Sequence, residues 1–447
     1  MGGLFMQNTD LLRVGYARAD ITPDEALPLG GYGNALKRVA TGTRDPLLAT
    51  CVAFSDAKGE TILVYSLDLL YYPDDYFAML RQRVSKDTGI PEDHVMLCAT
   101  HTHAGPSLGA YIPVTTPWAQ KLSDGVSRAA LDALADRKPA KLFAAGGEVP
   151  GMSFVRHYKQ EGGLYCGANF GFYTEAKIIA HTGNADWSFG LVKCVREGGK
   201  DILMLNWQVH PCLTMYGTEY SADYVAILRE QFEEKTGADF VFYLGAAGNL
   251  STVTRIPEEE VTQDMEAYGS AVVAHVMPAL DRLQPLADGE IRVASAVVEH
   301  PVNHSEDHKK EAAFEVRAFF EETNDLTATK KFARERGMNS IYHANAVIRK
   351  TDMGETRSIP IQAAVAGELA FAFAPYEMFS GNGVELKQTS PFPATFVNSC
   401  SNGYYGYLPT KDAFAYNCYE ANTTPFASGI GEKLSETFVK LMQDMKK

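Results

Sequence analysis

Short apolar runs of strand length recur through the first half of the chain, and amphipathic segments of helical length lie between them. The five clearest runs cover residues 61–67, 95–100, 141–145, 202–209 and 240–244. Runs of this length and composition are typical of β-strands. Strands that alternate with helices along a chain predict an α/β fold.

Three helices are expected between these strands, because apolar residues recur there at helical spacing. They cover residues 76–86, 122–133 and 224–235. Gly89 and Gly237 follow the first and third segments, where glycine commonly ends a helix, and Pro139 follows the second.

The second half of the chain has a more mixed pattern. It predicts strands at 291–299, 358–365 and 368–374, a charged helix over 311–336 and a terminal helix over 432–445. We find no internal repeat, low-complexity segment or flexible linker. We therefore expect a single domain over residues 1–447, with two lobes that meet near Pro285.

Charge and cysteine content narrow the class of protein. The net charge of −14 disfavours partners such as nucleic acid, which require clustered lysine and arginine. No window is apolar enough for a membrane span, and residues 1–10 do not resemble a signal peptide. Seven cysteines without C-x-x-C spacing indicate free thiols in a reducing compartment. A cytoplasmic protein is expected.

Two histidines, His101 and His103, follow the apolar run that begins at Val95, just before Gly105 and Pro106. Residues two apart in a strand share one face, so both imidazoles could enter one pocket. Imidazole is a common metal ligand and a common general acid or base. The alternative is a pair of ordinary polar residues, because a short H-x-H pattern is weak by itself.

Other polar residues also follow apolar runs. His210 ends the run 202–209, Ser251 follows a glycine-containing turn after 240–244, and Glu377 follows the run that ends at Ala374. Loops at strand ends are where α/β folds place functional residues. Taken one at a time, each could equally be a core histidine, a turn residue or a helix cap. The segment 402–419 is dense in tyrosine, which fits either an aromatic core or a site.

Taken in order, these segments resemble the catalytic domain of the neutral, non-lysosomal ceramidases, zinc amidases that cleave the N-acyl bond of ceramide. The resemblance runs from about residue 14 to about residue 419. Its motifs are GYARADITP at 15–23, GGYG at 30–33, DPL at 45–47, SLD at 66–68, ATHTHAGP at 99–106, NW at 206–207 with His210, SAD at 221–223, GNLS at 248–251 and the tyrosine segment 404–420.

This resemblance implies a mixed β-sheet core with flanking helices and a Zn²⁺ cofactor. The zinc ligands that it implies are His101, His210, Glu377 and Tyr407. Two imidazoles and a carboxylate are a common hydrolytic ligand set, and they leave a position for the water that attacks the amide.

The resemblance also implies four residues around the scissile amide. His103 would face the substrate as a hydrogen-bonding or proton-transfer group, and either Arg156 or Tyr419 could stabilise the oxyanion. Ser251 matches a serine that is either a nucleophile or a substrate contact. Either His103 or Tyr419 could supply the proton for the leaving nitrogen.

Three departures from the family favour a small soluble amide over ceramide as the substrate. Residues 251–253 read Ser-Thr-Val where the family more often has Ser-Pro-Asn, no signal peptide is seen, and no C-terminal immunoglobulin-like domain is expected. A zinc-dependent esterase or phosphoesterase with the same ligands is the second hypothesis. A non-catalytic binding member of the family is the third.

Overall fold

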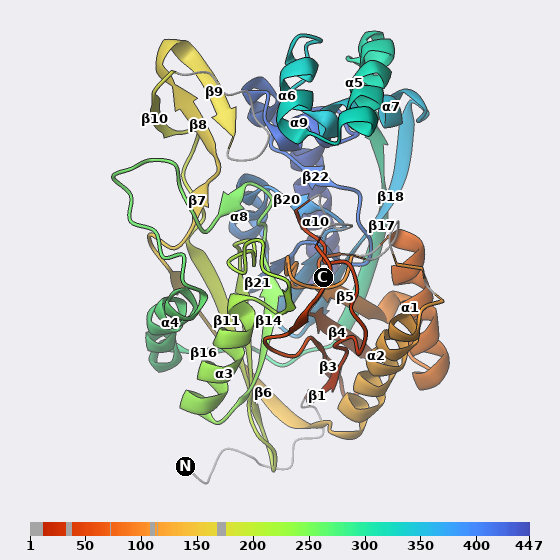
Figure 1. Cartoon of the computed structure of the whole chain (residues 1–447). Coiled ribbons are helices and arrows are strands. Elements are labelled where there is room, and N and C mark those ends of the chain that lie inside the picture. The colour runs from red at the N-terminus through yellow and green to blue at the C-terminus, as the bar shows by residue number, and fades with distance from the viewer. Residues whose placement is uncertain (1–11, 33–37, 72, 108–111, 114, 168–175) are drawn as a thin grey trace.

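The fold is built from two β-sheets packed face to face, with helices on both outer faces (Figure 1). It comes from a computed structural model that describes residues 12–32, 38–71, 73–107, 112–113, 115–167 and 176–447. Residues 1–10, on which the expectation about a signal peptide rests, lie outside the described residues, as does Gly33 of the N-terminal motif.

The larger sheet is mixed, as expected. Its strands run in the order β14 (Asp239–Leu244), β12 (Ile202–Trp207), β11 (Ser188–Arg196), β6 (Lys138–Glu148), β1 (Arg13–Asp20), β3 (Leu48–Ser55), β4 (Thr61–Leu67) and β5 (Val95–Ala99), with β16 (Gln284–Pro285) paired to β6. The pairs β12–β14 and β4–β5 at the two ends are parallel, and the other pairs are antiparallel.

The smaller sheet consists of β17 (Ile291–Pro301), β18 (Thr356–Ala366), β19 (Leu369–Phe373) and β21 (Ala394–Asn398). An apolar core lies between the two sheets and takes Val64 and Met96 from the larger one and Phe371 and Phe396 from the smaller one. Strands with both faces buried need apolar side chains on both, which explains why several of them are continuous apolar runs.

Helices cover the outer faces of both sheets. On the larger sheet lie α1 (Asp74–Thr88), α2 (Pro117–Ala135), α3 (Tyr224–Thr236) and α4 (Met265–Val276); on the smaller lie α8 (Ser380–Thr389) and α10 (Ile430–Lys446). At one end of the molecule, Figure 1 shows α5 (Lys310–Thr323), α6 (Leu326–Arg334), α7 (Ile341–Thr351) and the short α9 (Tyr419–Thr423).

The predicted segments coincide with observed elements, with one correction. The single helix expected over 311–336 is wrong, because Asn324 takes a left-handed conformation (φ 49°) and separates α5 from α6. Asp325 then caps α6 by accepting the backbone N–H groups of Thr327 and Ala328. All seven cysteines are unpaired. In the described part of the chain, every helix is too short or too polar to span a bilayer.

The larger sheet is curled, and this curl positions the candidate site. Ser66 Oγ in β4 donates to the carbonyl of Phe242 in β14 at 2.6 Å, although these strands lie near opposite ends of the sheet. The segment after β21 joins the same two edges, since Ser399 N–H donates to the Leu244 carbonyl and Asn402 N–H to that of Leu97. The carboxyl ends of β5, β12 and β14 are therefore neighbours.

Candidate metal centre

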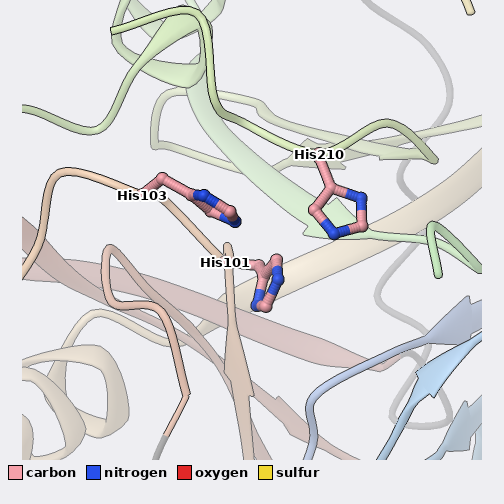
Figure 2. Close-up of side chains that lie close together, drawn as sticks. All are labelled: His101, His103 and His210. Carbon is pink, nitrogen blue, oxygen red and sulfur yellow. The ribbon is translucent and has the colours of Figure 1, made fainter. Parts of the chain in front are cut away.

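Three histidines converge where β5 and β12 end. Figure 2 shows the rings of His101, His103 and His210 facing a common space, and their centroids lie 4.9 to 5.6 Å apart. The backbone N–H of His103 donates to the carbonyl of Pro211 at 3.0 Å, which fastens the two loops together. The expected convergence is therefore present.

The prediction that His101 and His103 share one face of a strand is wrong. Strand β5 ends at Ala99, and His101 has a left-handed backbone (φ 65°), so the two imidazoles meet through a turned loop and not through strand alternation. A histidine with this backbone conformation is uncommon and is held by its surroundings. Its backbone N–H donates to the Leu69 carbonyl at 2.8 Å.

Glu377 completes the cluster from the segment that follows the smaller sheet's strand β19. It lies in β20 (Glu377–Met378), just after β19, and is 4% exposed. Its Oε2 atom lies 3.0 Å from His210 Nε2 and 3.3 Å from His101 Nε2. Its Oε1 atom accepts a hydrogen bond from the Tyr404 hydroxyl at 2.6 Å. Residues far apart in the sequence thus share one buried site.

The distances among these atoms fit a shared cation. Zinc bonds of roughly 2.0–2.2 Å in tetrahedral geometry place neighbouring ligand atoms about 3.3 Å apart. His101 Nδ1 lies 2.7 Å from the Leu70 carbonyl, which can only accept, so Nδ1 carries the proton. In the neutral ring, Nε2 then turns a lone pair toward the Glu377 carboxylate. Two such acceptors at 3.3 Å require a proton or a metal ion between them.

The pKa shifts of His103, His210 and Glu377 suit metal ligation. Burial lowers the pKa of His210 to about 4, helped by the nearby Arg156 charge. Burial, with His101 and His210 beside it, holds the pKa of His103 well below its usual value. Burial opposes ionisation of Glu377, yet the neighbouring imidazoles keep its pKa well below the usual range. Neutral imidazoles and an ionised carboxylate are the forms that bind metals. For His101, burial lowers the pKa, but the neighbouring Cys400 and Glu377 raise it well above its usual value, so this imidazole must lose a proton before it binds a metal.

Several buried nitrogens at the centre lack a partner. Among the described residues, neither ring nitrogen of His103 has a hydrogen-bond partner, and the same is true of His210 Nδ1. Buried polar atoms are normally satisfied, so these atoms point to a ligand, a water molecule or a substrate group at this place.

Arg156 approaches the same centre from the loop after β7 (Phe154–Val155). One terminal nitrogen donates to the Gly248 carbonyl at 2.7 Å and to the Tyr407 hydroxyl at 3.3 Å. Its Nε atom lies 2.7 Å from Glu420 Oε1, and the other oxygen of Glu420 lies 2.7 Å from His157 Nε2. This buried network fixes where the guanidinium points.

The group formed by His157, Cys418 and Glu420 could by composition hold a second metal ion. Both Glu420 oxygens, however, are already paired, one with Arg156 and one with His157. The adjacent guanidinium charge also disfavours a cation there. We interpret this group as an ion-pair network that orients Arg156.

Tyrosines form the wall beside Glu377. Tyr407 lies opposite Glu377 in the parallel pair of β20 and β22 (Tyr407–Leu408), and its ring centroid is 5.8 Å from that of Tyr419. Burial and the Glu377 charge raise the pKa of Tyr407, so its hydroxyl keeps its proton. The structure brings Tyr407 to the centre, and its assignment as a ligand stays a prediction.

Tyr404 and Glu420 were not given a role from the sequence. The only sequence signal for either was the tyrosine-rich segment, which does not show which of its members faces the site. Tyr404 donates a hydrogen bond to Glu377 and stacks on Tyr71 with ring centroids 3.6 Å apart.

Ser251 lies in β15 (Leu250–Ser251), which pairs with β7 next to Arg156. The backbone N–H of Arg156 donates to the Asn249 carbonyl at 3.0 Å. This bond and the pairing of β15 with β7 hold the Arg156 loop. The Ser251 hydroxyl accepts the Val253 N–H at 3.2 Å, a local turn contact. Its role as a nucleophile or a substrate contact stays a prediction.

Gly248 allows β20 to lie close to the turn after β14. Its N–H donates to the Met378 carbonyl at 2.7 Å, and a Cβ there would lie 2.4 Å from the Glu377 carbonyl oxygen. The Gly248→Ala variant should therefore displace Glu377, lose about 1–3 kcal/mol of unfolding free energy and bind metal more weakly. Urea unfolding and metal analysis test this. The matched control is Gly354→Ala, where a Cβ meets nothing within 4 Å; equal losses in both variants would contradict the prediction.

Comparison with known proteins identifies the fold. No protein-family model matches this sequence, and a search of curated proteins finds no match. The neutral ceramidase from Pseudomonas aeruginosa has a similar structure, with a TM-score of 0.72 and 19% identity over 98% of this chain and 75% of that chain. A ceramidase complexed with C2 gives a TM-score of 0.71 and 18% identity over the same shares. The chain has the neutral-ceramidase fold, as the sequence predicted.

Proposed function

We propose that the protein is a zinc-dependent hydrolase that cleaves a carboxamide bond in a small soluble amide. The observation that carries the proposal is the meeting of His101 Nε2 and His210 Nε2 with one oxygen of Glu377, at 3.3 and 3.0 Å in a buried centre. The metal would be held by these three residues, with Tyr407 as the fourth ligand. The neutral-ceramidase fold supports an amide as the bond that is cleaved.

An amide is a poor electrophile, so its hydrolysis needs an activated nucleophile, a stabilised oxyanion and a proton for the leaving nitrogen. Zinc in this place would supply a nucleophilic water at neutral pH and polarise the carbonyl. Arg156 is held by Glu420 with its guanidinium toward Tyr407, so it can donate to the oxyanion. His103, neutral and without a partner among the described residues, can accept a proton and deliver it to nitrogen.

The space beside the centre supports a small substrate. A cavity of about 330 Å³ is bordered by Tyr404, Tyr407 and Tyr419. This volume lies near the lower end for small-molecule pockets, which span roughly 300–1,000 Å³. A compact amide fits within this volume.

We also propose that the chain is one domain with two lobes. Strand β16 ends the larger sheet at Pro285 and β17 begins the smaller one at Ile291, which supports a boundary near Pro285. The shared core between the sheets supports a single folding unit. The seven unpaired cysteines support a reducing compartment such as the cytoplasm.

A side-by-side assay tests the activity. Purified protein, before and after metal removal and zinc return, is offered hexanoyl amides, the matching hexanoyl esters and hexyl phosphate. We expect zinc-dependent turnover that is fastest on an amide. Faster turnover of ester or phosphate would favour the second hypothesis, and tight zinc binding without any turnover would favour the binding protein.

A further inference from the structure

The lining of the cavity beside the metal centre includes positively charged side chains. Tyr404, whose hydroxyl bonds Glu377, forms the wall toward the centre. The lining also includes Arg349 from α7 and Arg357 from β18. Any substrate that enters the cavity is therefore exposed to two guanidinium groups.

Within the described residues, neither arginine forms an ion pair with a carboxylate. Arg349 donates one N–H to the Thr423 carbonyl at 2.8 Å, and the guanidinium carbon of Arg357 lies 5.5 Å from the centroid of the Tyr405 ring. Among the residues that the structure describes, no carboxylate lies within the 4.0 Å of either group that defines an ion pair. Both residues are exposed, so their guanidinium groups are accessible to a ligand in the cavity.

One acidic side chain, Asp74, also belongs to the described lining of this cavity. Its Oδ1 atom accepts the Tyr404 N–H at 2.8 Å, so Asp74 holds the tyrosine segment in place. With two cations and one anion, the charged lining has a surplus of one positive charge. A ligand with one negative charge would balance it.

We infer, on the basis of the proposed function, that the substrate is an amide with a carboxylate on one side of the scissile bond, as in an N-acyl amino acid. Arg349 and Arg357 bind this carboxylate, because guanidinium groups pair with carboxylates through two parallel hydrogen bonds. In the reaction, water adds across the C–N bond. The acyl carbon gains the oxygen, and the leaving nitrogen takes a proton and departs as the amino acid.

The test compares N-hexanoylglycine with N-hexanoylglycinamide, which differ in the negative charge. We expect the wild-type zinc enzyme to favour the acid by about 10- to 100-fold in kcat/KM, from hydrogen bonds to a charged group. In the Arg349→Gln/Arg357→Gln variant this ratio should fall to near one, chiefly through a higher KM for the acid. The matched control is Arg128→Gln, an exposed arginine on α2 paired with Asp132, which should keep the wild-type ratio.

A binding measurement separates this inference from the proposed function. Calorimetry with N-hexylsulfonylglycine, which cannot be hydrolysed as an amide, should show binding to wild type that the double variant loses. If wild type binds this compound, the double variant does not, and no amide is turned over, the proposed function is overturned but the anion site is supported. Equal kcat/KM for acid and amide in wild type, or an unchanged ratio in the double variant, would overturn the inference while the amidase proposal stands.

Discussion

Replacing His101 by alanine is expected to remove the bound metal and to reduce amide hydrolysis by about a thousandfold or more. His101 faces Glu377 at 3.3 Å, and its other nitrogen is fixed by the Leu70 carbonyl. Without the imidazole, the proposed ligand set of His101, His210, Glu377 and Tyr407 loses one of its two nitrogen donors. The catalytic loss and the metal loss should therefore appear together.

Elemental analysis of metal per chain checks this result on proteins purified identically. Wild type should contain about one zinc, and His101→Ala should contain almost none. His304→Ala is the matched control, because His304 lies near the surface and pairs with Asp307. A wild-type protein that takes up no zinc even when it is supplied would make the three histidines scaffold residues and would rule out the zinc hydrolase.

Replacing Glu420 by glutamine is expected to lower the free energy of unfolding by about 3–5 kcal/mol. Arg156 is 5% exposed and Glu420 is 1% exposed, so the variant leaves a buried guanidinium without its counter-ion. It also removes the carboxylate that bonds His157. A glutamine keeps the volume of the side chain, so the effect reports the lost charge and not a cavity.

Urea unfolding measures this loss, and a second variant identifies its cause. In Arg156→Met/Glu420→Gln no buried guanidinium is left unpaired, so much of the stability should return. Activity should not return, because the contact of Arg156 with Tyr407 is gone. Glu321→Gln on the surface of α5 is the control and should cost at most about 1 kcal/mol. If Glu420→Gln also lowered the free energy of unfolding by at most about 1 kcal/mol, the ion pair of Arg156 with Glu420 would not be the stabilising contact that we describe.

Several of the strands that the sequence predicted, β4, β5, β12 and β14 among them, have both faces covered, whereas β3 is also buried throughout and was not predicted. In β4, Leu63 and Tyr65 pack against helices, while Ile62 and Val64 face the smaller sheet. Such a strand is apolar throughout and is visible in the sequence. Strand β11 was not predicted, because buried and partly exposed residues alternate along it and leave no continuous apolar run.

The sequence could also locate His101, His103 and His210, because each follows a strand that is itself recognisable. It could not show that Glu377 meets them. That contact depends on the curl of the larger sheet, which brings the ends of β5 and β12 together, and on the packing of the smaller sheet beside them. The roles of Tyr404 and Glu420 depend on the same packing, since their partners lie at Glu377, Arg156 and His157.

Local sequence therefore determined the α/β class, the positions of several long strands and helices of the core and the histidines at strand ends, since each of these depends on neighbouring residues along the chain. Tertiary structure alone decided which carboxylate joins the histidines, how Arg156 is held and where the two unpaired arginines lie. These contacts join residues that are far apart in sequence, and the packing of two sheets fixes them. No local pattern encodes that packing.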